Sequence, residues 1–200
     1  LQPLLSIGAA CRERGVLIHT DATQLLPQGL IDWSSLPVDL LSFSSHKLQG
    51  PRGVGLLLHR QGLIQQPMQG GGGQEGGLRA GTEPVALIAG LAEALQSLPH
   101  FDPFHQSTPP GATPQLLGWR DRLQAQIEAI DGVTVLHGET TPRLPNHLAC
   151  LITTAGGSPL SGRRLVRELA RRNVACSSGS ACRSGKVQDS AVLSAMGVET

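Results

Sequence analysis

Polar side chains able to do chemistry follow two short apolar runs, at 16–18 and 38–43. They are Asp21, Gln24, Ser44, His46 and Lys47. A lysine amine that loses its proton can form a Schiff base with an aldehyde, and a carboxylate can pair with a protonated ring nitrogen. Hydroxyl and imidazole groups can donate hydrogen bonds to a phosphate. Together these groups could bind pyridoxal 5'-phosphate (PLP), a coenzyme that carries an aldehyde, a ring nitrogen and a phosphate.

The two apolar runs are the elements that must position these side chains. Short apolar runs bounded by polar turns are typical of buried strands in a parallel sheet. Ligands of open α/β sheets bind outside the carboxyl ends of such strands, so we expect the five polar groups to face one crevice. A further apolar run at 54–58 follows Gly50-Pro51-Arg52-Gly53 closely. This spacing predicts an antiparallel return that displays Lys47 at the mouth of a hairpin.

Considered one at a time, the same residues have simpler interpretations. Asp21 alone is more typical of a carboxylate that caps a strand, and Lys47 alone of an amine exposed to solvent. The convergence of several suitable groups at neighbouring strand ends favours the coenzyme site over these simpler readings.

The two motifs also resemble a known family. His-Thr-Asp-Ala-Thr-Gln at 19–24 and Ser-Phe-Ser-Ser-His-Lys at 42–47 are similar to the cofactor signature of the class V aminotransferase-like family, and within it to the cysteine desulfurases of the NifS/IscS-like group. The resemblance implies an α/β fold of the fold-type I PLP-dependent transferases. Part of the large domain's mixed sheet would be followed by a small C-terminal α+β domain. It also implies that Lys47 holds PLP, that Asp21 pairs with the ring nitrogen and that Gln24 binds the ring hydroxyl.

A glycine-rich stretch precedes a predicted helix at 84–98. By itself, the segment 70–77 is too rich in glycine for regular structure. Thr82 or Glu83 is expected near the N-cap of the helix that follows. A helix N-terminus beside Arg79 and Thr82 could hold a phosphate. The spacing Gly-Gly-Gly-x-x-x-Gly-x-Arg-x-Gly-Thr at 71–82 matches the family pattern. The resemblance implies that Thr82 contacts the PLP phosphate of a second subunit, and hence a homodimer with shared sites.

Cys182 lies in a loop of small residues beside Arg183 and Lys186, and nearby cations favour the nucleophilic thiolate. A loop cysteine alone is more often incidental, but Ser-Ser-Gly-Ser-Ala-Cys at 177–182 resembles the persulfide-forming loop of the desulfurases. The resemblance implies conversion of L-cysteine to L-alanine, with sulfur carried by Cys182 to an acceptor or scaffold protein. The transferred sulfur would be used in iron–sulfur cluster assembly or another sulfur-transfer pathway. We expect Cys176, on a short strand at 174–176, to pack structurally.

The chain is expected to comprise three parts. Residues 1–98 would be the C-terminal half of the PLP-binding large domain, 99–114 a Pro-rich linker, and 115–200 a small α+β domain with the cysteine loop. Helices are predicted from 115 to 130 and from 160 to 172, and strands at 133–136 and 147–152. The arginines of 160–172 are more typical of a solvated face than of a binding patch.

Composition limits the kinds of binding partner and the cellular compartment that we expect. The formal charge of +1 argues against nucleic acid or an anionic membrane as the main partner, and no apolar run approaches the length of a membrane span, about 20 residues. The four cysteines include no Cys-x-x-Cys pair or zinc-like grouping with histidine, so we expect no metal site. Without a secretory signal, reduced thiols in a cytoplasmic protein fit better than disulfides.

The first residues of the sequence bear on whether it is a whole protein. The sequence opens inside an expected helix with no strand before it, which favours an internal or partial sequence over a naturally short protein. We expect the isolated segment to be an incomplete enzyme.

One alternative function is another class V PLP lyase or transaminase, such as a selenocysteine lyase, for which Cys182 is expendable. The other is a truncated, non-catalytic relative that binds sulfur acceptors or dimerises.

Overall fold

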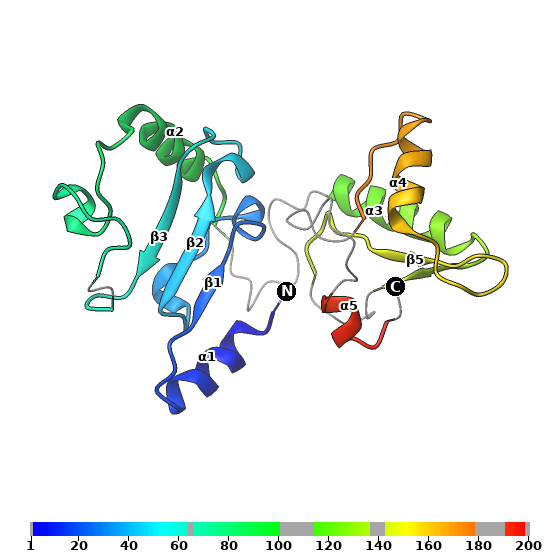
Figure 1. Ribbon diagram of the computed structural model, residues 1–200, viewed down its shortest axis with the longest axis horizontal. Helices are drawn as coiled ribbons and strands as arrows, with labels where there is room; N and C mark the ends of the chain where they lie inside the picture. Colours follow the sequence, from blue (N-terminus) through cyan, green and yellow to red (C-terminus); the bar gives the residue numbers. More distant parts are fainter. Residues whose placement is uncertain (1, 64–65, 101–113, 137–142, 179–190, 199–200) are drawn as a thin grey trace. The chain divides into compact units, whose positions relative to one another are not determined.

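A computed structural model describes residues 2–63, 66–100, 114–136, 143–178 and 191–198 (Figure 1). The chain divides into two compact units, the first made of residues 1–117 and 142–146 and the second of residues 118–141 and 147–200. The predicted parts 1–98, 99–114 and 115–200 stay a prediction. Each unit is described by itself.

The first unit is built on a three-stranded sheet in the order β1-β2-β3 (Figure 1). β1 (His19–Asp21) pairs in parallel with β2 (Leu40–Ser44), and β2 pairs antiparallel with β3 (Gly55–His59). The antiparallel return predicted after the lysine turn is therefore confirmed. The sheet is mixed, with parallel strands where the polar motifs lie.

One face of this sheet carries the core of the first unit. Leu41 and Phe43 are buried, while Ser42 between them lies on the other face because side chains alternate along a strand. Helix α2 (Val85–Gln96), rich in strong helix formers, adds Leu91 to the same hydrophobic cluster. Helix α1 (Leu4–Glu13) buries Gly8, where a side chain would collide with the neighbouring Pro37. The other face of the sheet carries Ser42 with its register partners Asp21 and Leu57.

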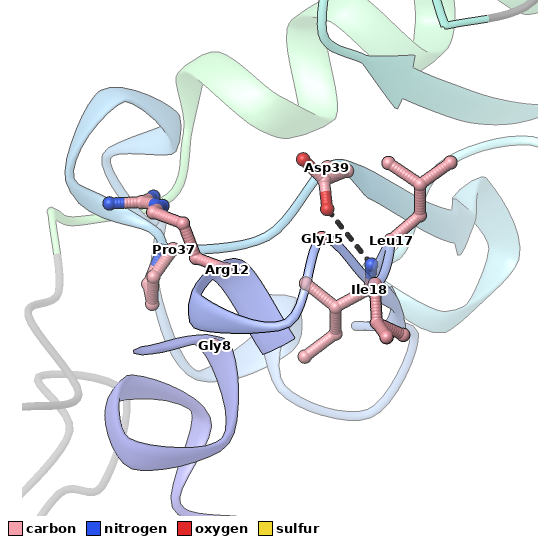
Figure 2. Close-up of a pocket in the computed structure, with 8 residues that line it drawn as sticks. Gly8, Arg12, Gly15, Leu17, Ile18, Pro37 and Asp39 are labelled. Atoms are coloured by element: carbon pink, nitrogen blue, oxygen red, sulfur yellow. Dashed lines mark hydrogen bonds between the residues drawn. The ribbon is translucent and has the colours of Figure 1, made fainter. Parts of the chain in front are cut away.

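The strand predicted at 16–18 is wrong in position. Val16 and Leu17 are 54% and 59% exposed, and strand pairing begins only at His19. The Asp39 carboxylate accepts a hydrogen bond from the Ile18 backbone N–H at 2.9 Å (Figure 2). The Ile18 N–H is therefore bonded to a side chain and not to the backbone of a neighbouring strand. The regular pairing starts one residue later, at His19.

Arg60 ties the loop before β2 to the end of β3. Its guanidinium donates to the backbone oxygens of Trp33, Leu36 and Val38 at 3.0, 2.8 and 3.2 Å. The same group lies 4.2 Å from the centre of the Trp33 ring, a cation–π contact. One side chain therefore satisfies three carbonyl groups and fixes the entry into β2.

Two local predictions near α2 can be compared with the structure. The segment 70–77 is expected to lack regular structure, and within it Gln74–Gly77 is a turn with left-handed backbone angles at Glu75 and Gly76. The Gln74 side chain organises this loop by accepting a hydrogen bond from the Gly81 N–H at 3.3 Å. The residue at the α2 N-cap is Pro84, without a side-chain cap, and not Thr82 or Glu83.

The second unit contains a two-stranded antiparallel sheet and its helices. β4 (Val133–Val135) pairs with β5 (Cys150–Ile152), and Val135 lies opposite Cys150 in the register. The helices are α3 (Pro114–Glu128), which starts in the first unit, α4 (Gly162–Ala170) and α5 (Ala191–Ala195). Helices and strands were predicted near all of these positions except α5. In the described ranges, no helix has the length and apolarity needed to span a membrane.

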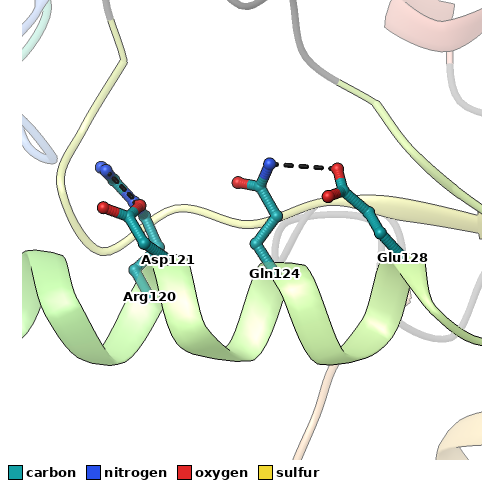
Figure 3. A network of polar contacts seen from close by, with 4 residues as sticks. All are labelled: Arg120, Asp121, Gln124 and Glu128. Carbon is teal, nitrogen blue, oxygen red and sulfur yellow. Dashed lines mark hydrogen bonds and ion pairs between the residues drawn. The ribbon is translucent and has the colours of Figure 1, made fainter.

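Two polar contacts of α3 join residues of the helix itself (Figure 3). Arg120 pairs with its neighbour Asp121 at 2.7 Å, and the Gln124 amide donates to the Glu128 carboxylate at 3.0 Å. The second pair has the i, i+4 spacing at which side chains meet on a helix surface. These contacts support the helix itself.

Residues 174–178 do not form the strand predicted at 174–176. The described backbone there has no strand pairing, and Cys176 is exposed. The expectation that Cys176 packs in a strand is therefore wrong.

Replacing Arg60 by Met should destabilise the first unit. The substitution keeps much of the apolar stem but removes three hydrogen bonds to carbonyl groups and the contact with Trp33. We expect a loss of about 2–4 kcal/mol in the free energy of unfolding, measured by urea denaturation. The exposed Arg52 provides the control, because Arg52→Met should change stability little. Equal effects of the two substitutions would contradict the role given to Arg60.

Candidate functional site

The polar residues of the two sequence motifs meet at one edge of the sheet. Because β1 and β2 are parallel, their carboxyl ends lie at the same edge, and Asp21 faces Ser42 across the pair. The Ala22 N–H donates to the Ser42 oxygen at 2.9 Å, which continues the pairing past the end of β1. The chain therefore leaves both strands side by side, as a ligand site at strand ends requires.

Asp21 is an exposed carboxylate held in its charged form. Its Oδ1 accepts a hydrogen bond from the Thr23 N–H at 2.9 Å. Hydrogen bonds from the Thr23 hydroxyl and from that N–H lower the pKa of Asp21 below its usual 3.8, and nearby His19 adds to the effect against a small opposing cost of burial. A carboxylate that stays ionised suits pairing with a protonated ring nitrogen.

His19 lies on the same face of the sheet as Asp21, two residues earlier on β1. Its Nε2 lies 2.9 Å from the hydroxyl oxygen of Ser42 on the neighbouring strand. This contact crosses between the strands beside Asp21. It places two polar side chains next to each other on the face opposite the core, which also carries Leu40 and Leu57.

The lysine turn is a short 3-10 helix, η3 (Ser45–Lys47), at the end of β2. Ser45 is fully buried, and its backbone oxygen accepts hydrogen bonds from Leu48 and Gly50 at 3.0 and 3.1 Å. A side chain at Gly50 would collide with the Ser45 hydroxyl oxygen, so the turn needs glycine there. With Ser45 as the anchor, His46 and Lys47 project from the turn as exposed side chains.

Ser44 and Gln24 supply further polar groups at this edge. Ser44 precedes η3 as its N-cap residue, but its side chain makes no cap hydrogen bond. Gln24 is exposed in the turn that follows β1. The donor set near the strand ends therefore comprises an amine, a carboxylate, a hydroxyl, an imidazole and an amide, which together fit the groups of PLP.

Thr82 lies in the loop before α2 and is exposed. The Arg79 guanidinium in this loop donates to the oxygen of Ala80 at 2.8 Å. In the described part of the chain, no hydrogen bond joins Thr82 to Asp21 or Lys47. The structure contains one chain, so a contact from Thr82 to a second subunit stays a prediction.

Cys182 lies outside the described residues, as do Arg183 and Lys186 beside it. The described chain before this loop ends at Ser178, which is half-buried. The role given to Cys182 therefore rests on the sequence motif.

Sequence reasoning missed the residues that support Asp21. Thr23 was not singled out, although a threonine two residues after an aspartate is a recognisable local pattern, since Asp side chains accept from the backbone two residues on. The contact of His19 with Ser42 had no local signal, because the two residues are 23 positions apart. Local turn chemistry could have found the first contact but not the second.

A small cavity of about 180 Å³ lies at the other edge of the sheet (Figure 2). Arg12, Ile18 and Asp39 contribute to its lining, near the amino ends of β1 and β2. It is therefore remote from the strand ends that carry Asp21 and Ser44. The candidate site is an open edge of the first unit and not this cavity.

Comparison with known proteins identifies the family. Residues 1–196 match the family model for aminotransferase class-V. The chain belongs to the class V aminotransferase family. Enzymes of this family are PLP-dependent, which agrees with the donor set at the ends of β1 and β2.

Curated relatives of this family member are cysteine desulfurases. The chain is 38% identical over 200 residues to cysteine desulfurase IscS of Histophilus somni, with 99% of this chain and 46% of that protein covered. The chain thus spans about half the length of the curated relatives it matches. The resemblance to NifS/IscS-like desulfurases is confirmed.

Solved structures confirm the fold class. A NifS-like protein from Rickettsia africae superposes with a TM-score of 0.78 at 24% identity, over all of this chain and 49% of that one. SspA in complex with cysteine gives a TM-score of 0.69 at 28% identity, over all of this chain and 51% of that one. The first likeness concerns the fold alone. Together with the family match, these likenesses support the predicted α/β fold of fold-type I PLP-dependent enzymes.

Replacing Thr23 by Ala should raise the pKa of Asp21 toward 3.8, because the hydroxyl hydrogen bond to the carboxylate is lost. Carbon-13 NMR titration of the Asp21 carboxyl group measures this change, and Thr23→Ser is the control that keeps the hydroxyl. The folded-state pKa lies below the unfolded value, so Asp21 stabilises the fold fully above pH 3.8. That contribution is lost as the pH falls through the folded pKa. An unchanged pKa in Thr23→Ala would contradict the assignment.

Proposed function

We propose that this chain forms the coenzyme-holding and sulfur-carrying part of a PLP-dependent cysteine desulfurase. The observation that carries the proposal is the parallel pairing of β1 with β2, which brings Asp21 and the turn of Lys47 to one sheet edge. The proposal draws on the similarity to cysteine desulfurase IscS and to SspA, whose structure contains cysteine. The substrate would be L-cysteine and the products L-alanine and a protein-bound sulfur.

The residues at the strand ends would divide the binding of PLP among them. When bound, PLP acts as an electron sink for reactions at an amino-acid substrate. Lys47 would hold the coenzyme covalently and, when released, move a proton as a general acid or base. Asp21 would keep the ring nitrogen protonated, and Gln24 would bind the ring hydroxyl. Ser44 and His46 would donate to the phosphate.

The sulfur step would belong to Cys182. Its thiolate would attack the sulfur of the substrate, so that an S–S bond forms as the C–S bond breaks. The remaining three-carbon fragment takes up a proton and leaves as alanine, while Cys182 keeps the sulfur as a persulfide. A loop of small residues suits this role, because the thiol must meet both the substrate and an external acceptor.

We further propose a cytoplasmic homodimer that passes its sulfur to an acceptor or scaffold protein. Thr82 would contact the PLP phosphate of the second subunit, which makes each site depend on two chains. Iron–sulfur cluster assembly is the pathway that we favour, given the IscS relatives.

PLP should label one lysine of this chain selectively. The sequence has only two lysines, Lys47 and Lys186, so the label can be assigned without ambiguity. We expect borohydride reduction after PLP titration to fix the coenzyme at Lys47, as mapped by peptide mass spectrometry. Lys47→Arg should remove the label, and Lys186→Arg should leave it. Equal labelling of the two lysines would argue against a coenzyme site.

Replacing Cys182 by Ser separates the desulfurase from another class V lyase or transaminase. In the complete enzyme we expect sulfide and alanine release to fall at least about 100-fold, because the nucleophile is gone. Spectral changes of the coenzyme on adding cysteine should persist. Cys176→Ser, at an exposed cysteine six positions earlier, is the matched control and should keep full activity. Retained desulfuration in Cys182→Ser would favour the lyase.

A further inference from the structure

Two of the described cysteines, Cys150 and Cys176, are exposed. Cysteine is among the residues most often fully buried in proteins, and the reactivity of a free cysteine usually matters more than its packing. Packing in a core does not explain an exposed thiol. Both residues belong to the second unit, and neither has a role in the coenzyme chemistry proposed above. The positions of these two thiols within the second unit therefore bear on what they can do together.

Cys150 opens β5, and its backbone groups face the edge of β5 that β4 does not cover. The Thr153 N–H donates to the Gly132 oxygen at 2.7 Å across the pair of strands. Because such bonds alternate along an antiparallel pair, Ile152 and Cys150 direct their N–H and C=O groups to the second edge of β5. On that edge the Leu160 N–H donates to the Ile152 oxygen at 2.7 Å.

The chain along this second edge leads into helix α4. An antiparallel bridge pairs Thr153 with Pro159, in the same register as the bond just described. Continued by three residues along each segment, this register brings Gly162, the first residue of α4, toward Cys150. The start of the helix therefore lies on the Cys150 side of β5.

The segment 174–178 returns to the start of α4 from the far end of the helix (Figure 1). The Val174 N–H donates to the Leu169 oxygen at 3.0 Å, a bond that reverses the chain after the helix. The nine residues of α4 span about 14 Å, a length that five extended residues also cover. A side-chain carbon at Gly162 would lie 2.7 Å from the Ser178 Cβ, so the segment ends against the first residue of α4.

Two elements therefore bring Cys150 and Cys176 toward the same place. Cys176 lies two residues before the contact of Ser178 with Gly162, and Cys150 approaches the same helix start from β5. The charges agree with this placement. Although Cys150 is exposed as a residue, partial burial of its thiol raises its pKa, and the nearby Cys176 thiol raises that pKa further. We call these two cysteines the thiol pair.

We propose that Cys150 and Cys176 form a redox-active dithiol, which a small disulfide such as glutathione disulfide converts into a reversible disulfide bond. Disulfides that form in the cytoplasm are usually transient and serve catalysis or redox sensing. Exposed disulfides are also the more easily reduced ones. An exposed thiol pair therefore suits a bond that opens and closes with the surrounding thiol pool.

The exchange needs no group beyond the thiol pair and the glutathione disulfide. One cysteine thiolate attacks a sulfur of glutathione disulfide, which forms a mixed disulfide and releases one glutathione. The second cysteine thiolate attacks the protein sulfur of that mixed disulfide, which closes the Cys150–Cys176 bond and releases the second glutathione. The two cysteines lose two electrons and two protons, and the two glutathione thiols take them up.

The closed bond would tie β5 to the chain that follows α4. It would enclose α4 in a covalent loop between Cys150 and Cys176 and hold the segment 174–178 at the edge of β5. Such a loop restricts the unfolded chain, so the oxidised second unit should resist unfolding more than the reduced one.

Equilibration of the full chain with glutathione buffers tests the proposal. Cys11→Ser and Cys182→Ser leave the thiol pair as the only thiols. We expect a mass lower by two hydrogen atoms and a peptide map that joins Cys150 to Cys176. The effective concentration of the pair, measured against glutathione, should be at least about 10-fold higher in the folded chain than in concentrated urea. In urea the same loop closes only through chain flexibility.

Three variants of the same chain serve as controls. Cys150→Ser and Cys176→Ser each leave one thiol, which should take up one glutathione and form no internal bond. The double substitution Cys150→Leu, Leu151→Cys moves the thiol to the opposite face of β5, because successive side chains of a strand alternate. Its effective concentration should fall at least about 10-fold toward the value in urea. Circular dichroism checks that each variant keeps its fold.

Three results would overturn the proposal. One is a folded chain that carries two glutathione adducts and no internal bond. Another is an effective concentration no higher than in urea, and the third is equally ready closure from position 151. The measurement uses neither PLP nor Cys182, so failure of the thiol pair and failure of the proposed function are distinguishable.

Discussion

The parallel pairing of β1 with β2 is the constraint on which the candidate site depends. β1 has only three residues, and contacts beyond its two ends define the pairing. Asp39 accepts the Ile18 N–H before the strand, and the Ser42 oxygen accepts the Ala22 N–H after it. A slip of one residue would turn Asp21 toward the core, because side chains alternate along a strand. These contacts therefore place the carboxylate on the face where the chemistry is proposed.

The first unit separates the groups that stabilise it from the groups proposed to react. Leu41 and Phe43 bury one face of β2, while Ser42 and Ser44 line the other. The same division occurs in the lysine turn, where the buried Ser45 holds the backbone and Lys47 remains exposed. An anchored backbone with an exposed amine limits the positions that the amine can reach. This precision is what a covalent coenzyme attachment needs.

The two proposed chemical tasks fall in different units of the chain. The groups suited to PLP lie on the sheet of the first unit, whereas the cysteine motif follows α4 in the second. The family match spans both units, from residue 1 to residue 196. The chain covers about half the length of its curated relatives, so the complete activity is proposed for the protein as a whole.

The sequence by itself indicated the family and the main elements. The spacing of Asp21, Gln24 and Lys47 at the ends of apolar runs, and the return through Gly50 to β3, were readable because they depend on neighbours in sequence. Tertiary structure alone decided where β1 begins, since that follows from a bond between Ile18 and Asp39, 21 positions apart. It also decided that Cys176 is exposed. Such features depend on packing between distant segments, which periodicity and local turn chemistry do not record.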